Sequence, residues 1–493
     1  MGKRQTWLSK FLAAPSKYPL VLAIATGLYP IFFYYTNNYS LINTSRHLSF
    51  FVGLFLGVPL LVFLAARLFF KSKFVILQYR IPSFFNVLFF LIFIELCLYA
   101  KIQWVFTLVI LIVAFVVARF FSRYLGRIAL FQLLLAVVAL CFAVPVVYGQ
   151  LNYSESWMEQ PDDIEEVIFK KRPNIYFIQP DGYVNFSEIN KGYYQFDNSE
   201  FATFLEDQNY SIYPEARSNY CTTLTSNSSI FTMKHHYYNN GFNFKERMNA
   251  REVIISDNAV LRVLKNNDYK THYLAEWAYL LINRPEMGYD ACNFSYDEIP
   301  LLSKGFDEIR EVAPSLSQFM DLDEEASKFF FIELFLPGHI ATNAIESTGK
   351  EKEKEWWISN LNAANEKLKT LLSLIEAKDP EALVVIMSDH GGYVGLDYMQ
   401  ELRIKTQDRD KLYSGFSSIL AVKWPNNEAP NFENKLKTGV NLFRILFAYL
   451  GEKKPYLEHL QDDGSYHLVD KNAPKGIYQY IDGDGKVVFK KQN

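Results

Sequence analysis

Five apolar runs fill the first 150 residues of this chain and limit its possible folds more than any other feature. Each run is close to the ~20 residues that an α-helix needs to cross a bilayer. The runs extend over Tyr18–Tyr35, Leu48–Phe70, Phe84–Ala100, Ile102–Phe121 and Ile128–Tyr148. Buried helices of a soluble core are the alternative interpretation, but five runs in succession favour a membrane domain. A cleaved signal peptide is disfavoured because four more runs follow the first.

Basic residues between the runs indicate the orientation of this predicted membrane domain. One set of loops carries only Arg46 and Lys101. The other set, with the N-terminal segment, carries Lys3, Arg4, Lys10, Lys17, Lys71, Lys73, Arg80, Arg119, Arg123 and Arg127. Because cytoplasmic loops are enriched in lysine and arginine, the N-terminus is predicted to be cytoplasmic. Five spans across the inner (cytoplasmic) membrane then place everything after Tyr148 on the extracytoplasmic, periplasmic side.

Charge and cysteine content exclude some classes of function. The formal net charge of -3 gives no sign of a polyanionic partner, so we expect no nucleic-acid binding. Four cysteines do not make a disulfide framework in a chain of 493 residues. Cys97 and Cys141 lie in predicted spans and are interpreted as small apolar side chains. Cys221 and Cys292 lie outside, where a disulfide is permitted, and their pairing stays open.

The rest of the chain alternates short apolar runs with helical patterns. Buried strands that end in turns are indicated by "PNIYFIQPDGY", "NNDYKTHYLAEW", "ASKFFFIELFLPGH", "ALVVIMSDHGG" and "SSILAVKWP". Such alternation predicts an α/β domain with a mainly parallel sheet covered on both faces. The predicted domains are a five-helix transmembrane domain (1–150), a juxtamembrane connector (151–172), a catalytic domain (173–456) and a C-terminal extension of it (457–493).

Polar residues follow three of the predicted strands directly. They are Asp181, His339 and the pair Asp389–His390. Because ligands of such folds gather at the carboxyl ends of strands, Asp181, Asp389 and His390 are candidate ligands of one divalent ion. A mixed oxygen and nitrogen set suits Mn, Zn or Mg. The alternative is that "SDHGG" is only a turn, but three such strand ends in one sheet favour the metal.

Four segments resemble successive motifs of the alkaline phosphatase superfamily: "NIYFIQPDGY", the hydroxyl-rich "SNYCTTLTSNSS", "FIELFLPGHI" and "VVIMSDHGG". The match is closer to its sulfatase-like membrane branch, which contains lipoteichoic acid synthases and phosphoethanolamine transferases. "TGVNLFRILFAYLG" resembles a segment that follows the core in that branch. The resemblance covers roughly 172–456. It implies an extracytoplasmic α/β/α sandwich after five spans.

The hydroxyl-rich stretch offers several nucleophiles, of which Thr222, Thr223 and Cys221 are the main candidates. Sulfatases of the superfamily use a cysteine in a Cys-x-Pro-Ser-Arg motif, and the stretch from Cys221 departs from it at all three defined positions. The phosphotransferase pattern aligns instead with Thr223 as the nucleophile. A hydroxyl needs activation by a metal or a base, so Thr223 is also a candidate metal ligand.

Other histidines and aromatic residues have less defined roles. The resemblance implies that His339 contacts the phosphoryl oxygen or protonates the leaving group, although "LPGHI" departs from the usual transferase motif. Phe335 stands where two-metal relatives carry an aspartate, which favours a single metal ion. His235 and His236 are interpreted as a polar helix end rather than ligands. His272, Trp277 and Arg284 are weaker candidates for the cleft or for binding a headgroup.

The leading hypothesis is a membrane-bound, metal-dependent phosphotransferase. A phospholipid donor would pass its headgroup, phosphoethanolamine or phosphoglycerol, to Thr223 and then to a glycan or lipid acceptor of the cell envelope. The second hypothesis is a sulfatase-like phosphodiesterase or other hydrolase, in which water replaces the acceptor. The third is a non-catalytic membrane scaffold, which the set Asp181, Thr223, Asp389 and His390 disfavours.

Overall fold

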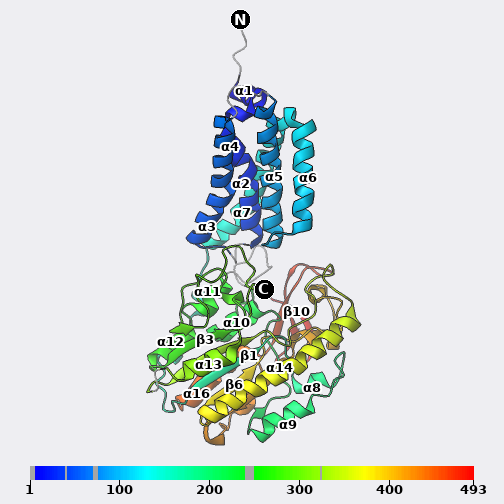
Figure 1. Ribbon diagram of the computed structural model, residues 1–493. Helices are drawn as coiled ribbons and strands as arrows, with labels where there is room; N and C mark the ends of the chain where they lie inside the picture. The colour runs from blue at the N-terminus through cyan, green and yellow to red at the C-terminus, as the bar shows by residue number, and fades with distance from the viewer. Residues whose placement is uncertain (1–5, 39–41, 70–75, 239–248, 323–324, 493) are drawn as a thin grey trace. The chain divides into compact units, whose positions relative to one another are not determined.

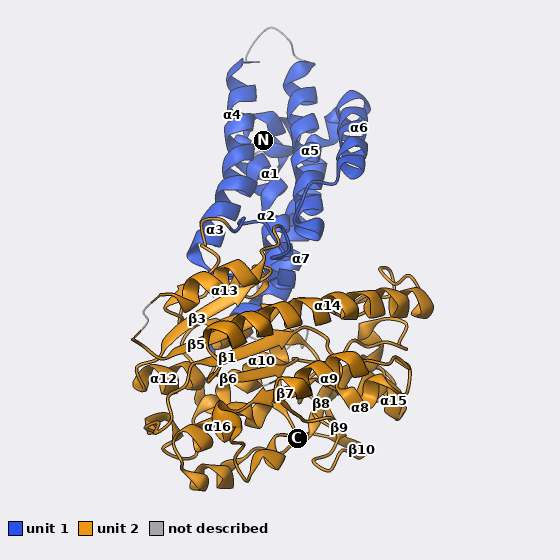
Figure 2. Cartoon of the chain, turned by 60° about the horizontal axis from the view of Figure 1, so that its bottom comes forward, with its two compact units in different colours: residues 1–153, 282–284, 299–307 blue, residues 154–281, 285–298, 308–493 orange. Residues whose placement is uncertain are grey.

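The structure is a computed structural model that describes residues 6–38, 42–69, 76–238, 249–322 and 325–492. The chain divides into two compact units, shown in Figure 2. Unit 1 consists of residues 1–153, 282–284 and 299–307. Unit 2 contains the rest of the chain.

Unit 1 is built from helices that run side by side (Figure 1). A π-helical turn, Gly53–Gly57, joins α3 to α4. The helices are α1 (Trp7–Ala13), α2 (Pro19–Asn38), α3 (Ser45–Val52), α4 (Val58–Phe69), α5 (Leu77–Tyr99), α6 (Trp104–Phe120) and α7 (Leu125–Leu151).

Four helical segments among the described residues are long and apolar enough to cross a membrane: Pro19–Asn38, Ser45–Phe69, Leu77–Tyr99 and Ser122–Leu151. The fourth predicted run forms α6, which has 17 residues. At 1.5 Å per residue α6 is about 25 Å long, less than the ~30 Å of a hydrocarbon core. All five runs are therefore helical, but the number of five spans stays a prediction. Phe70, the last residue of the second run, lies outside the described residues.

Polar side chains connect three helices inside unit 1. The Asn86 amide donates to Thr26 Oγ1 and to Gln132 Oε1 at 2.9 Å, and Gln132 donates back to Asn86 Oδ1 at 3.1 Å. These three buried residues belong to α2, α5 and α7. Because an unpaired polar group is costly in an apolar medium, their mutual hydrogen bonds fix how the helices pack.

Unit 2 is organised around a seven-stranded sheet of order β2-β7-β6-β1-β5-β3-β4. β1 pairs in parallel with both β5 and β6, and β3 pairs in parallel with β5 and β4. β7 and β2 add an antiparallel edge. The strands are β1 (Ile175–Pro180), β2 (Ser211–Ile212), β3 (Lys270–Ala275), β4 (Ala291–Cys292), β5 (Lys328–Leu334), β6 (Leu383–Met387) and β7 (Leu420–Lys423). All five predicted strands are present, and the sheet is mainly parallel as predicted.

Helices cover both faces of this sheet (Figure 1). Tyr176 and Phe330 face a core with α9 (Ser199–Asp207), α13 (Val312–Met320), α14 (Lys350–Lys378) and α15 (Arg409–Phe416). On the other face, Phe177 and Phe331 pack against Phe231 of α10 (Thr223–Thr232). Beside α10 lie α11 (Ala250–Ile255), α12 (Ala259–Asn266) and α16 (Leu442–Leu450). Burial on both faces explains why the strands read as continuous apolar runs.

The segment predicted as a C-terminal extension contains a second, antiparallel sheet. Its strands are β8 (Ser465–Val469), β9 (Gly476–Ile481) and β10 (Val487–Lys491), in the order β10-β9-β8. Val469, Tyr478, Tyr480 and Ile481 belong to the same hydrophobic cluster as the helices over the main sheet. The extension is therefore packed into the core of unit 2.

Candidate metal centre and nucleophile loop

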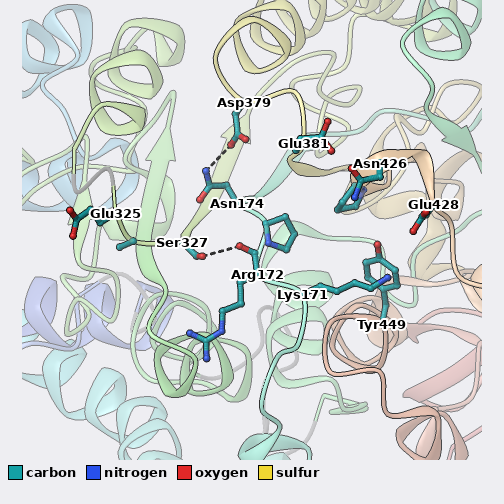
Figure 3. Close-up of a pocket in the computed structure, with 13 residues that line it drawn as sticks. Lys171, Arg172, Asn174, Glu325, Ser327, Asp379, Glu381, Asn426, Glu428 and Tyr449 are labelled. Atoms are coloured by element: carbon teal, nitrogen blue, oxygen red, sulfur yellow. Dashed lines mark hydrogen bonds between the residues drawn. The ribbon is translucent and has the colours of Figure 1, made fainter.

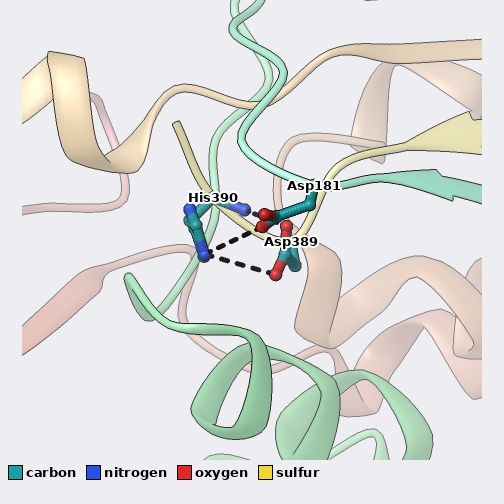
Figure 4. A group of neighbouring side chains, drawn as sticks. All are labelled: Asp181, Asp389 and His390. Carbon is teal, nitrogen blue, oxygen red and sulfur yellow. Dashed lines mark hydrogen bonds and ion pairs between the residues drawn. The ribbon is translucent and has the colours of Figure 1, made fainter. Parts of the chain in front are cut away.

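Two neighbouring parallel strands bring three candidate ligands together. β1 ends at Pro180 and β6 at Met387, so Asp181 and the pair Asp389–His390 leave the sheet at the same edge. One ligand atom of each side chain lies within 4.8 Å of the others. Figure 4 shows the three side chains pointing toward one another. The arrangement follows from the rule that places sites at the carboxyl ends of parallel strands.

The candidate ligand atom of the histidine faces one oxygen of each carboxylate. His390 Nδ1 lies 2.9 Å from the Gly391 carbonyl oxygen, which can only accept, so Nδ1 carries the proton. His390 Nε2 then faces Asp181 Oδ1 and Asp389 Oδ2, each at 3.3 Å. Neither of these buried carboxylate oxygens has a hydrogen-bond donor in the described part of the chain. Asp389 and Asp181 favour a proton on His390, and a divalent cation between these atoms would take the place of that proton, so the residues fit a metal ion.

The pKa values indicate a local lack of positive charge. Burial, reinforced by Asp389, raises the pKa of Asp181 to about 7, although His390 opposes the shift. Burial alone would lower the pKa of His390, but Asp389 and Asp181 together hold it above its usual value. A buried carboxyl such as Asp181, which resists ionisation beside a second carboxylate, is typical of a site that a cation completes.

Glu333 is a further buried carboxyl near this centre that sequence reasoning missed. Burial raises its pKa to about 8, a hydrogen bond from Tyr273 lowers it, and Asp389 and Asp181 raise it further. The Tyr273 hydroxyl donates to Glu333 Oε2 at 2.6 Å. The available signal was a glutamate inside the buried run "FFFIEL", because lone charges are rarely buried without a role.

His339 follows β5 at the same edge of the sheet. Its ring centroid lies 5.7 Å from that of His390. Burial and the neighbouring His390 lower its pKa, and Nδ1 donates to its own neighbour, the Ile340 carbonyl, at 2.7 Å. His339 is thus a neutral imidazole. A Cβ on Gly182 would stand 2.0 Å from the Gly338 carbonyl oxygen, so glycine at 182, with φ of +66°, permits the close approach of these two turns.

The hydroxyl-rich stretch forms the start of α10. Thr222 is the N-cap residue and Thr223 the first helical residue, and both are partly exposed. The Thr222 hydroxyl lies 2.7 Å from Thr225 Oγ1, which itself donates to the Thr222 carbonyl. The Thr223 hydroxyl, in contrast, makes no hydrogen bond to the residues that the structure describes. Of the two threonines, Thr223 therefore has the hydroxyl available for chemistry.

Helix α10 is fixed against the strands that carry the metal ligands. Gln179 of β1 and Asn227 of α10 exchange two hydrogen bonds, of 2.8 and 2.7 Å. Ser226 and Ser229 line one small internal pocket together with Asp389. The unpaired N–H groups of the first turn of a helix also favour anions. The start of α10 thus belongs to the same edge of the sheet as the ligands.

Cys221 has the properties of a structural side chain rather than a nucleophile. It is fully buried, and burial raises its pKa to about 12. Its Sγ lies 3.0 Å from Nδ1 of His467, whose pKa burial lowers to about 3. The thiol therefore stays protonated, and a thiol is a poor nucleophile. Cys221 and Cys292 are both free, so the disulfide left open by the sequence does not form.

The other histidines that the sequence singled out lie outside the centre. His235 lies between the Tyr220 hydroxyl and the Asp462 carbonyl, at 3.1 and 2.7 Å. His236 is buried beyond the end of α10, and its Nε2 lies 2.9 Å from the Thr225 carbonyl oxygen. His272 stacks on Phe330 within the sheet. The weaker candidate Arg284 belongs to unit 1, where it contacts His47 at 3.0 Å.

A large surface pocket of about 620 Å³ lies elsewhere (Figure 3). Its lining includes Asn174 before β1, Ser327 before β5 and Glu381 before β6, so it marks the amino edge of the sheet. Asp379 there accepts hydrogen bonds from Asn174 and from the Tyr176 hydroxyl, at 2.8 and 2.9 Å. This pocket does not contain the candidate metal ligands.

Comparisons with known proteins give matches among solved structures. No protein-family model and no curated protein matches the chain. Lipooligosaccharide phosphoethanolamine transferase A from Neisseria meningitidis is 14% identical, with a TM-score of 0.42 over 90% of this chain and 95% of its own. The periplasmic domain of EptC from Escherichia coli is 11% identical, with a TM-score of 0.43 over 63% of this chain and 93% of its own.

The lipoteichoic acid synthase LtaP from Listeria monocytogenes is 14% identical, with a TM-score of 0.41 over 67% of this chain and 91% of its own. Sulfatases are also among the similar structures. Transferases, a synthase and sulfatases are thus the solved structures to which this chain is similar.

Proposed function

We propose that this chain is a membrane-bound, metal-dependent phosphotransferase of the alkaline phosphatase superfamily. Asp181, Asp389 and His390 bind one divalent ion, Mn, Zn or Mg. The observation that carries the proposal is the position of His390 Nε2, 3.3 Å from two buried carboxylate oxygens that lack hydrogen-bond donors in the described structure. Bound there, the ion supplies Lewis acidity toward a hydroxyl and a phosphoryl oxygen.

Thr223 is the proposed nucleophile. Its oxygen attacks the phosphorus of a phospholipid headgroup, and the bond from phosphorus to the diacylglycerol oxygen breaks. The proton that Thr223 loses balances the proton that diacylglycerol gains. Its unengaged hydroxyl and its place at the first turn of α10 support this role, since the helix end favours the anionic phosphoryl group. His339 is proposed to bind the phosphoryl group.

An acceptor then takes the headgroup from the phosphothreonine, which restores the Thr223 hydroxyl. The long apolar helices of unit 1 fit a donor that stays in a membrane leaflet. The proposed donors carry phosphoethanolamine or phosphoglycerol, and the proposed acceptor is an envelope glycan or lipid. With the N-terminus in the cytoplasm, the reaction takes place on the extracytoplasmic side of the inner membrane.

The test is to incubate the purified full-length protein with labelled phosphatidylethanolamine or phosphatidylglycerol and to map the adduct by mass spectrometry. We expect a headgroup phosphate on Thr223, release of diacylglycerol, and loss of both in Thr223→Ala or with a chelator. Thr222→Ala is the matched control and keeps the adduct. An adduct on Cys221, or activity that survives Thr223→Ala, would contradict the proposal.

The same assay separates transfer from hydrolysis, the second candidate function. Continuous diacylglycerol release only when an acceptor glycan is added supports a transferase. Continuous release with water alone supports a phosphodiesterase that uses the same residues.

A further inference from the structure

The loop that leads into α10 is held by backbone contacts along one side. Ser218 N donates to the Phe416 carbonyl at 2.7 Å, and Arg217 N donates to the Lys437 carbonyl at 3.0 Å. Val440 N donates to Asn219 Oδ1 at 2.8 Å. These contacts fix the loop to the last residue of α15 and to the segment that precedes α16, both of which belong to unit 2.

On its other side the same loop pairs with β8 of the C-terminal sheet. Ser465 Oγ donates to the Ser218 carbonyl at 2.7 Å, and Tyr466 N donates to the Asn219 carbonyl at 2.8 Å. The Asn219 amide donates back to the Gly464 carbonyl at 2.9 Å. The contacts continue to Cys221. Its thiol lies 3.0 Å from Nδ1 of His467, which also belongs to β8.

Cys221 also contacts the turn that carries the metal ligands. The Tyr393 hydroxyl donates to the Cys221 carbonyl, and the Tyr393 ring lies 5.7 Å from the His390 ring. Tyr393 is buried and has φ of +62°, a left-handed conformation that costs energy for a residue other than glycine. Such conformations persist where the surroundings impose them, and they cluster at functional sites.

We infer that Cys221 is the joint that positions Thr223 over the metal centre, held by His467 from the C-terminal sheet and by Tyr393 from the ligand turn. Cys221 lies two residues before Thr223, so a shift of the joint moves the hydroxyl relative to Asp389 and His390. His467 and Tyr393 are positioning residues, and β8 contributes to the reaction only by positioning Thr223 through Cys221. This inference rests on the proposed function of Thr223.

Paired substitutions in the full-length protein test it. His467→Leu removes the hydrogen-bond partner of the Cys221 thiol, whereas His467→Asn keeps a polar partner near the position of Nδ1. Cys221→Ala and Cys221→Ser form the equivalent pair, and Tyr393→Phe removes only the hydroxyl. Because small displacements of a reacting group are costly, we expect His467→Leu, Cys221→Ala and Tyr393→Phe to slow single-turnover adduct formation by between about tenfold and a hundredfold. His467→Asn and Cys221→Ser should stay close to wild type.

Two further readouts separate positioning from loss of stability. The Kd for Mn²⁺ should stay unchanged in all five variants, because none removes a ligand. Tyr176→Phe, which removes a buried hydroxyl at the far edge of the same sheet, is the matched control and should leave the adduct rate unchanged. Equal adduct rates in wild type, His467→Leu and Tyr393→Phe would overturn the inference, as would an equal loss of rate in Tyr176→Phe.

The rate at which iodoacetamide alkylates Cys221 measures how well the contacts of Cys221 hold, independently of the transfer reaction. We expect Cys221 to be protected in the wild type and to react at least about tenfold faster in His467→Leu, because the buried thiol is accessible only when the joint opens. If the wild type forms no adduct but this difference holds, the proposed function fails while the contact of β8 with the loop stands. Equal alkylation in both proteins overturns the inference.

Discussion

The two edges of the main sheet both carry carboxylates, yet they differ in how these are satisfied. At the amino edge, Asp379 accepts two hydrogen bonds and borders an open pocket of about 620 Å³. At the carboxyl edge, Asp181 Oδ1 and Asp389 Oδ2 are buried, have no hydrogen-bond partner among the described residues, and face His390 Nε2. In this sheet, unsatisfied ligand atoms distinguish the candidate metal centre from the amino edge, whereas cavity size and acidic content do not.

The largest expected difference comes from substituting one carboxylate at each edge by an amide. Asp389→Asn removes a charged ligand, so we expect metal binding to be lost and headgroup transfer to fall by at least about a thousandfold. Asp379→Asn keeps the size of the side chain at the other edge and should leave transfer unchanged. Isothermal titration with Mn²⁺ and the adduct assay measure both. Equal effects at the two edges would remove the distinction between them.

The pH dependence should also differ between the edges. Because the pKa of Asp181 is about 7, protons compete with the metal below that pH. We expect Mn²⁺ affinity to fall by about tenfold for each unit below pH 7. Asp181→Asn should remove this dependence along with most of the affinity, whereas Asp379→Asn should leave it intact. An Mn²⁺ affinity that does not change between pH 5 and pH 7 would contradict the raised pKa that burial beside Asp389 gives Asp181.

The same pKa predicts how stability changes with pH. The folded-state pKa of Asp181 is raised above the ordinary value of 3.8, so the folded state holds more protons than the unfolded state between those values. In the metal-free protein, the contribution of Asp181 to stability is therefore present at low pH and is lost as the pH rises through about 7. Mn²⁺ should raise Tm more at pH 8 than at pH 5, which differential scanning fluorimetry can measure.

A smaller effect is expected at Glu333, which lies near the ligands but is not one of the three. With a pKa of about 8, its carboxyl is largely protonated at neutral pH and resembles an amide. Glu333→Gln should therefore change Mn²⁺ affinity by less than about threefold. A loss of affinity comparable to that of Asp389→Asn would make Glu333 a fourth ligand and would change the proposed site.

The smallest effect is expected at the amino edge. Tyr176→Phe removes one hydrogen bond to Asp379, which also keeps the donor from Asn174. We expect a loss of about 1 kcal/mol in the free energy of unfolding of unit 2, measured by urea denaturation of the full chain, and no change in headgroup transfer. A change in transfer would mean that the two edges are coupled.

Sequence patterns predicted those parts of the fold that depend on local periodicity. The runs that became β1, β5 and β6 are apolar throughout because both faces of these strands are buried, and the turns after them contain the expected polar residues. The short strands β2 and β4 have two residues each and leave no pattern to detect. The C-terminal sheet was missed although its strands pair with their neighbours in sequence, β9 lying antiparallel between β8 and β10.

The candidate site was predictable to a similar extent. Strand ends placed Asp181, Asp389 and His390 at one edge, since topology fixes where the chain leaves a parallel sheet. The burial of Cys221 against His467 depends on tertiary packing over 246 residues, which no spacing in the sequence encodes. Glu333 could have been noticed as a glutamate inside a buried apolar run, but its closeness to Asp181 and Asp389 follows only from the folded chain.

The most direct test of the metal centre is anomalous diffraction from crystals of the protein soaked with Zn²⁺. We predict one strong peak between Asp181, Asp389 and His390, within ordinary coordination distance of His390 Nε2, and none near Asp379 or Glu381. A peak at the amino edge, or an empty carboxyl edge in which His390 Nε2 remains in contact with both carboxylates, would contradict the proposed centre.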